Sequence, residues 1–120
     1  MTSIDKEINL AEKQCTACLA GAPLLRGEAL TTALLQVPEW QCVTLNNQEQ
    51  ISREFIFKNF EQAMVFTQKV ANLAEHENHH PAILTEWGKV TVSWWTHEIG
   101  GLHENDLICA AKTDQLFAGY

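Results

Sequence analysis

Basic side chains are scarce in this 120-residue chain. Eight lysines and arginines stand against fifteen aspartates and glutamates, and the formal net charge is −7. Nucleic-acid binding relies on lysine and arginine to neutralise phosphates, so we expect no direct nucleic-acid partner. No apolar run approaches the ~20 residues that span a bilayer, and Met1 to Gln14 lack a signal-peptide core. The sequence therefore predicts a cytoplasmic protein that has no membrane partner.

Cysteine is also infrequent, and in the cytoplasm the four residues are expected to be mostly reduced. Cys15 and Cys18 form a CxxC motif, which can be half of a zinc site or a redox pair. A complete zinc site needs a second pair of ligands, whereas Cys42 and Cys109 stand alone in the sequence. We therefore interpret residues 1–26 as an N-terminal arm, with a metal or redox role as the alternative, and residues 27–120 as a single domain.

The first half of the domain carries the pattern of a helix followed by a β-hairpin. Leu30, Ala33, Leu34 and Val37 recur at helical spacing, and Pro38 ends that helix. Residues 40–45 and 51–58 are rich in apolar, β-branched and aromatic side chains. The turn-prone Asn46-Asn47 lies between them, in a loop whose length leaves the register of the hairpin open.

The second half repeats this order. Asn59 is a good N-cap, with Gln62 placed for a capping box, and a helical apolar stripe runs from residue 60 to residue 74. This helix must stop near Asn78, because Pro81 disfavours helical geometry at His80. Residues 83–87 and 89–96 predict a second hairpin, and a last helix begins around residue 107. The order α-β-β-α-β-β-α predicts an α+β fold, in which helices pack on one face of a four-stranded, largely antiparallel sheet.

All five histidines lie between His76 and His103, with carboxylates nearby. Imidazole exchanges protons near neutrality and also binds metals. Residues 76–80 match the zinc motif H-E-x-x-H, which requires both histidines on one face of an intact helix. Since Pro81 places His80 outside the helix, we treat the match as accidental and expect no metal.

Metal-free proton transfer is the alternative. At a helix end, the adjacent His79 and His80 can diverge to reach two sides of one small ligand. His97, at the end of the fourth strand, can return to the same pocket, and Glu75 is close in sequence. We expect His76 and His103 to be caps or solvated side chains.

Together these residues resemble the pterin-4a-carbinolamine dehydratase family, whose mammalian member doubles as a dimerisation cofactor of a homeodomain transcription factor. The resemblance covers about Gly27 to Leu116. Its ordered set comprises Glu75, His79-His80-Pro81, Trp87-Gly88-Lys89-Val90, Thr96-His97-Glu98 and Gly101-Leu102. The Cys15/Cys18 arm and the run from Leu84 to Val92 look like the bacterial branch of the family.

The resemblance implies a hydro-lyase that converts 4a-hydroxytetrahydrobiopterin to quinonoid dihydrobiopterin and water, without a cofactor. This reaction recycles the pterin of aromatic amino acid hydroxylases. His79 and His97 would be acid–base residues, His80 would hold or polarise the pterin, and Glu75 would support the site. Pocket-lining residues would extend over His79, His80, Pro81, Thr96, His97, Glu98 and Ile99.

The resemblance further implies a homodimer or homotetramer, with a phenylalanine hydroxylase as a partner. A non-catalytic module that binds a hydroxylase or a transcriptional partner is the alternative function. Two positions depart from the family pattern. Ile83 replaces an aromatic residue, which weakens any stacking role there, and the mammalian type often has an acidic residue directly before the two histidines. Asn78 stands there, so any carboxylate role passes to Glu75 or Glu77.

Overall fold

The computed structural model describes residues 10–16 and 24–119, so Cys18 of the CxxC motif lies outside the described residues. The elements are the 3-10 helix η1 (Leu10–Glu12), α2 (Gly27–Leu34), β1 (Gln41–Leu45), β2 (Gln48–Ile56), α3 (Phe60–Glu77), β3 (Ala82–Glu86), β4 (Lys89–Trp94), the 3-10 helix η2 (His97–Ile99) and α4 (Glu104–Phe117). Apart from the two short 3-10 helices, this is the predicted order. None of the described helices is long and apolar enough to cross a membrane.

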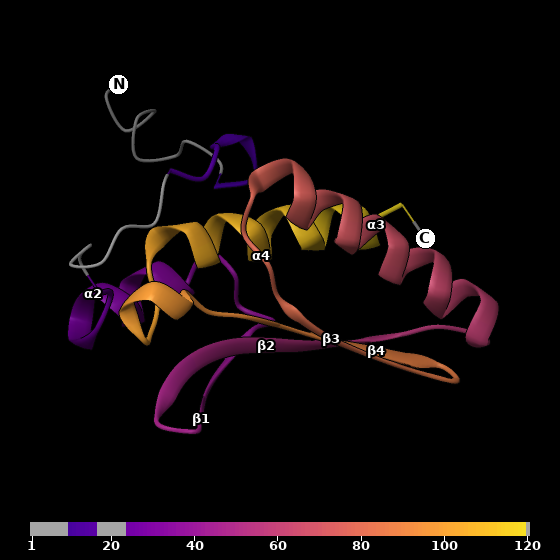
Figure 1. Cartoon of the computed structure of the whole chain (residues 1–120), viewed down its shortest axis with the longest axis horizontal. Helices are drawn as coiled ribbons and strands as arrows, with labels where there is room; N and C mark the ends of the chain where they lie inside the picture. Colours follow the sequence, from indigo (N-terminus) through magenta and orange to yellow (C-terminus); the bar gives the residue numbers. More distant parts are fainter. Residues whose placement is uncertain (1–9, 17–23, 120) are drawn as a thin grey trace.

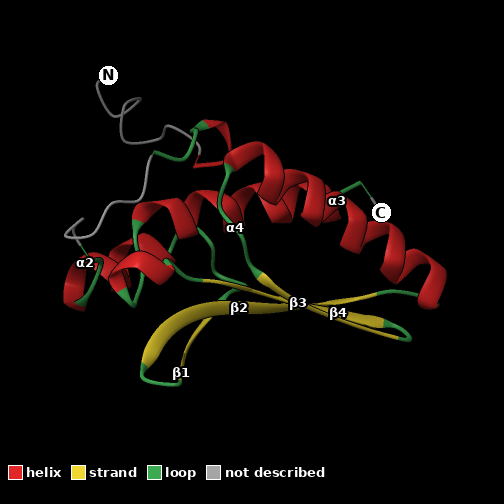
Figure 2. Cartoon of the chain, viewed as in Figure 1, coloured by secondary structure: helices red, strands yellow, loops and turns green. Residues whose placement is uncertain are grey.

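The four strands form one antiparallel sheet in the order β1-β2-β4-β3. The long helices α3 and α4 lie over one face of this sheet, as Figures 1 and 2 show. The predicted α+β fold is therefore confirmed. The central strand β4 leads directly toward the histidine region, because η2 and α4 follow it in the chain.

The first hairpin is tighter than the sequence suggested. β2 begins at Gln48 and pairs with Leu45 across a two-residue turn. Asn46 and Asn47 both adopt positive φ angles, 52° and 64°. Turns of this kind match the twist of the paired strands, and asparagine tolerates the left-handed conformation. The expected longer loop was wrong, since the two asparagines make the connection alone.

The first helix is shorter than its apolar stripe. α2 ends at Leu34, and the amides of Leu35, Gln36 and Val37 each bond to the carbonyl three residues earlier. The chain has thus tightened into turns before it reaches Pro38, as expected where proline disfavours helical geometry at the preceding residue. Val37 is nevertheless buried, which explains why it completes the helical pattern.

Both ends of α3 lie where the sequence predicted, but only one of the two hydrogen bonds of the predicted capping box forms. The Asn59 side chain accepts a hydrogen bond from the Gln62 amide at 2.8 Å, which caps the first turn. The Gln62 side chain accepts from the Lys58 amide at 3.4 Å, one residue before the cap. At the other end, Asn78 takes the left-handed conformation with φ 53° and ψ 43°. The helix therefore stops where Pro81 required.

The core lies between the sheet and the helices. Its largest fully buried side chains include Trp94, Phe55 and Phe66, which come from β4, β2 and α3. Leu10 of η1 belongs to the same cluster and is only 6% exposed. The described part of the N-terminal arm thus packs into the core of the domain.

The fourth strand is shorter than predicted. It ends at Trp94, and Thr96 forms an isolated bridge with Gly101 instead of continuing the sheet. The reciprocal backbone bonds between Thr96 and Gly101 are 2.8 and 3.3 Å long. Gly100 has a φ of 66°, and a Cβ on Gly101 would lie 2.7 Å from Leu24 Cδ2. The glycine pair therefore permits a tight turn on which η2 is built.

Candidate active site

The end of α3 sends its two consecutive histidines to different environments. Asn78 leaves the helix in the left-handed conformation, after which His79 is 6% exposed and His80 is exposed. The register of β3 and β4 pairs Ala82 with Ser93, so the histidines precede β3 on the side where β4 ends. The predicted divergence of the two imidazoles is confirmed.

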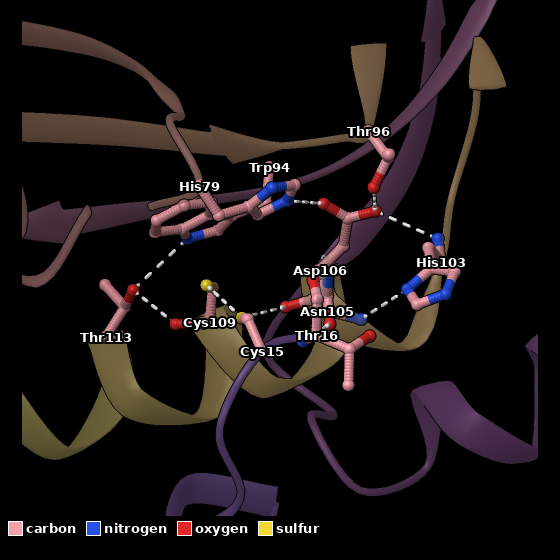
Figure 3. A network of polar contacts seen from close by, with 10 residues as sticks. All are labelled: Cys15, Thr16, His79, Trp94, Thr96, His103, Asn105, Asp106, Cys109 and Thr113. Carbon is pink, nitrogen blue, oxygen red and sulfur yellow. Dashed lines mark hydrogen bonds and ion pairs between the residues drawn. The ribbon is translucent and has the colours of Figure 1, made fainter. Parts of the chain in front are cut away.

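His79 is held inside the protein on two sides. Its Nε2 lies 2.6 Å from Oδ1 of Asp106. Its ring stacks on Trp94 with a centroid distance of 5.7 Å and an interplanar angle of 7°. A carboxylate on one nitrogen and an aromatic plane below the ring fix the imidazole in one orientation. Figure 3 shows His79 and Asp106 joined in a network that extends along α4.

Asp106 is the centre of this network and was not among the site residues predicted from the sequence. The side chain is fully buried. Besides His79, it accepts hydrogen bonds at Oδ2 from Thr96 Oγ1 at 2.8 Å and from the His103 amide at 2.9 Å. Buried carboxylates are tolerated when partners of this kind satisfy them. The spacing His103-x-x-Asp106 at the start of a helix is the one local signal that could have identified it.

His80 has a carboxylate partner of its own. Its Nε2 lies 2.6 Å from Oε2 of Glu75, and the two side chains are 57% and 78% exposed. This direct contact between Glu75 and His80 is consistent with the prediction that Glu75 supports the site. Glu77, the other carboxylate considered for this role, is turned away. It accepts from the Cys15 amide at 2.9 Å and lies 3.7 Å from Lys112 Nζ.

His97 is exposed on η2, directly after the bridge at Thr96. Its position at the end of a strand was predicted incorrectly, because the strand stops at Trp94. Its ring lies on that of Trp95, with a centroid distance of 4.4 Å. The indole Nε1 of Trp95 is buried and has no hydrogen-bond partner among the described residues. The Trp95 ring thus packs against the exposed imidazole of His97.

The structure separates the remaining predicted lining residues by exposure. Thr96 is fully buried and serves Asp106 with its hydroxyl. Pro81 and Ile99 are half-buried, and Glu98 is exposed. Accordingly, the side chains open to a ligand are those of His80, His97 and Glu98, while Thr96 acts from beneath the surface.

The imidazoles of the two histidines assigned to the background make no contact with the site histidines, although the His103 amide donates to Asp106. His103 is the N-cap of α4, and its Nδ1 accepts from the Asn105 amide at 3.0 Å. His76 lines a hollow of about 450 Å³ together with Glu77, Lys112 and other residues of α3, α4 and the arm. It cannot share a helix face with His80, because α3 ends at Glu77. The H-E-x-x-H geometry is therefore not formed.

The carboxylates also determine which ring nitrogens are available. Each carboxylate faces Nε2 of its histidine and favours the proton on that atom. In neutral His79 and His80, Nδ1 then carries the lone pair and can act as a base or acceptor. The arrangement thus offers one buried, oriented imidazole and two exposed ones, which suits proton transfer to and from a small ligand.

Comparison with known proteins gives a family and two similar relatives. The family model for pterin 4 alpha carbinolamine dehydratase matches residues 23–116. A protein from Marinobacter nauticus, provisionally named a pterin-4-alpha-carbinolamine dehydratase, is 58% identical over 109 residues, covering 91% of this chain and 98% of its own. A protein with the same provisional name from Syntrophotalea carbinolica is 52% identical over 107 residues, covering 89% and 96%.

A solved structure extends the comparison to the fold. The crystal structure of a transcriptional coactivator/pterin dehydratase from Brucella melitensis superimposes with a TM-score of 0.70 at 31% identity. The match covers 78% of this chain and 98% of the other.

Proposed function

Since the chain belongs to the pterin 4 alpha carbinolamine dehydratase family, we propose that it dehydrates 4a-hydroxytetrahydrobiopterin to quinonoid dihydrobiopterin and water. The observation that carries this proposal is the buried contact between His79 and Asp106, together with the exposed imidazoles of His80 and His97. The reaction requires one proton for the leaving hydroxyl on C4a and the loss of another from the adjacent ring nitrogen. Imidazoles perform both transfers near neutral pH.

The contacts support a distinct role for each residue. His79 and His97 are the acid–base residues at the 4a position. His79 is oriented by Asp106 and presents a small part of its ring, since it is 6% exposed. His97 offers an exposed ring that is supported by Trp95.

His80 and Glu75 form the binding side of the proposed site. The Glu75 carboxylate contacts Nε2 of His80 at 2.6 Å, so Nδ1 is the nitrogen of that ring proposed to meet the ligand. His80 thereby holds or polarises the pterin, and Glu75 acts through it. Pro81, Glu98 and Ile99 complete the proposed lining, and Thr96 acts beneath it through its hydrogen bond to Asp106.

The test is the loss of the carbinolamine's ultraviolet absorbance, measured with purified protein before and after treatment with a chelator. We expect the same rate in both samples. The His79→Ala and His97→Ala variants should each lose most of the rate, by roughly 10²–10⁴-fold as for other acid–base residues, while their circular dichroism stays native. His76→Ala is the matched control, since His76 lies outside the proposed site, and it should keep the wild-type rate.

Two outcomes would contradict the proposal in different ways. Activity lost with chelator and restored by zinc would overturn the metal-free chemistry. Wild-type rates in both the His79 and His97 variants would overturn the residue assignment while leaving the activity itself intact.

A binding module is the second candidate, because the similar Brucella melitensis protein carries the name of a transcriptional coactivator as well as that of a dehydratase. A folded protein with no dehydratase rate would favour the module. Pull-down of a phenylalanine hydroxylase would instead support the recycling role. Both functions can coexist on one chain.

A further inference from the structure

Cys15 and Cys109 are 94 positions apart in the chain, yet their sulfur atoms lie 3.5 Å from each other. Cys15 is half-buried in the arm, after η1, and Cys109 is fully buried on α4. In the sequence Cys109 stood alone and Cys15 had a neighbour only in Cys18. The fold therefore creates a thiol pair that the CxxC motif does not contain. Figure 3 shows the two side chains meeting beside α4.

Polar contacts of Cys15 and of the next residue, Thr16, hold the arm against α3 and α4. The Thr16 amide donates to Asn105 Oδ1 at 3.0 Å, and Asn105 Nδ2 donates to the Thr16 carbonyl at 2.8 Å. The Cys15 amide donates to Glu77 at 2.9 Å. These bonds keep the two sulfur atoms adjacent without a covalent link.

Further contacts hold the start of the arm in place. Lys112 Nζ donates to the Ala11 carbonyl at 2.8 Å, and Lys13 pairs with Glu104 at 2.7 Å. Both anchors are on α4, the helix that carries Cys109. The arm is therefore fixed against α4 before any bond forms between the sulfur atoms. The two sulfur atoms need to approach by only about 1.5 Å to reach the ~2.05 Å length of a disulfide bond.

We propose that Cys15 and Cys109 are a site of reversible disulfide formation, which links the N-terminal arm covalently to α4 when a low-molecular-weight disulfide is present. This inference is independent of the dehydratase reaction. It gives the cysteine of the arm a redox role with a different partner from the one its motif suggests.

The chemistry is a two-step exchange. The Cys15 thiolate attacks the small disulfide RSSR, forming a mixed disulfide and releasing RS⁻. The Cys109 thiol then loses its proton and attacks Cys15 Sγ, releasing the second RS⁻. The two protein thiols are oxidised by two electrons, and RSSR is reduced to two RSH. Cys15 reacts first because it alone of the pair is partly accessible.

The second step should be slow at neutral pH. In the reduced pair, the pKa of the Cys109 thiol is raised by its hydrogen bond with Cys15, by burial and by the nearby carboxylates of Asp106 and Glu77. Burial and the two carboxylates still act on Cys109 once Cys15 is part of the mixed disulfide. A thiol with a raised pKa is mostly protonated and therefore a weak nucleophile. Closure should thus accelerate as the pH rises.

The test uses the full chain, reduced and then incubated with excess oxidised glutathione at pH 7 and pH 9. Peptide mapping by mass spectrometry under non-reducing conditions should find a fragment in which Cys15 and Cys109 are joined. Thermal unfolding should shift upward by roughly 5–15 °C, because the link closes a long loop of the unfolded chain. Dithiothreitol should reverse both changes.

Four single variants separate the alternatives. Cys15→Ser and Cys109→Ala should each abolish the linked fragment and the thermal shift. Cys42→Ser, which alters an exposed cysteine on β1, should abolish neither. Cys18→Ser should also still form the link. A Cys15–Cys18 disulfide in the wild-type chain, or glutathione adducts without any Cys15–Cys109 fragment at either pH, would overturn the proposal.

Discussion

Asp106 is the residue on which the described geometry of the site depends most. Its side chain is fully buried and accepts hydrogen bonds from the Thr96 hydroxyl, the His103 amide and the His79 ring. One carboxylate thereby connects the start of α4, the bridge after β4 and the imidazole after α3. Loss of its charge should affect His79 more than the fold, because the other two partners need only a neutral acceptor.

We predict that Asp106→Asn keeps the fold but lowers the dehydratase rate by roughly 10²-fold or more. The His103 amide can only donate, so the asparagine oxygen must face it, and Nδ2 must face His79. His79 would then accept at Nε2 and carry its proton on Nδ1, the reverse of the wild-type tautomer. Nitrogen chemical shifts of the imidazole would report this reversal directly.

Asp114→Asn is the matched control for that experiment. Asp114 lies on the same helix and bonds to Trp40 and Arg53 instead of a histidine. It should change stability and leave the rate and the His79 tautomer unaltered. A similar loss of rate in both variants would mean that α4 acts only through its general stability.

At the scale of elements, the end of α3 is the feature that places the two consecutive histidines of the site. Asn78 takes the left-handed conformation, and the His79 amide bonds back to the Ala74 carbonyl at 3.1 Å. A helix ending of this type reverses the chain direction within one residue. It turns His79 toward Trp94 and leaves His80 beside Glu75.

We expect Asn78→Gly to keep stability and rate, because glycine adopts positive φ without strain. Asn78→Val should lower the free energy of unfolding by about 1–2 kcal/mol, since a β-branched side chain is disfavoured there. Urea unfolding of both variants measures this difference. If valine proved harmless, the left-handed turn would have no part in holding the two histidines.

At the scale of the whole molecule, the N-terminal arm and the domain share one core. Leu10 is 6% exposed and clusters with residues of the sheet and helices. The arm's contacts with α4 and α3 then place it next to the network around Asp106. The arm should therefore contribute to the same cooperative unfolding transition as the sheet.

We predict that Leu10→Ala lowers the free energy of unfolding by about 2–4 kcal/mol, as for other buried leucines. The control is Leu35→Ala, because Leu35 is 75% exposed and its replacement should stay within about 0.5 kcal/mol of wild type. Chemical denaturation monitored by tryptophan fluorescence measures both. A Leu10→Ala variant as stable as wild type would indicate an arm that unfolds separately.

Much of the fold could be predicted because its signals are local. Apolar periodicity located the helices and strands, Asn59 and Pro81 bounded α3, and the element order led to the sheet with helices on one face. The errors were at ends. β4 stops early because Thr96 pairs with Gly101, a contact that no period reveals, and the hairpin is tight because both asparagines accept positive φ.

The sequence by itself determined the chemistry available to this protein: its histidines, their carboxylate neighbour Glu75, and a proline that removes His80 from the helix. These depend on residue type and on spacing within a few positions, where backbone sterics are decisive. Only the tertiary structure decided the long-range partners. Asp106 reaches His79 across 27 positions and Cys109 reaches Cys15 across 94. Such contacts arise because α4 packs against α3 and the arm. The residues next to Asp106 and Cys109 in the sequence do not indicate which distant side chain each of them contacts.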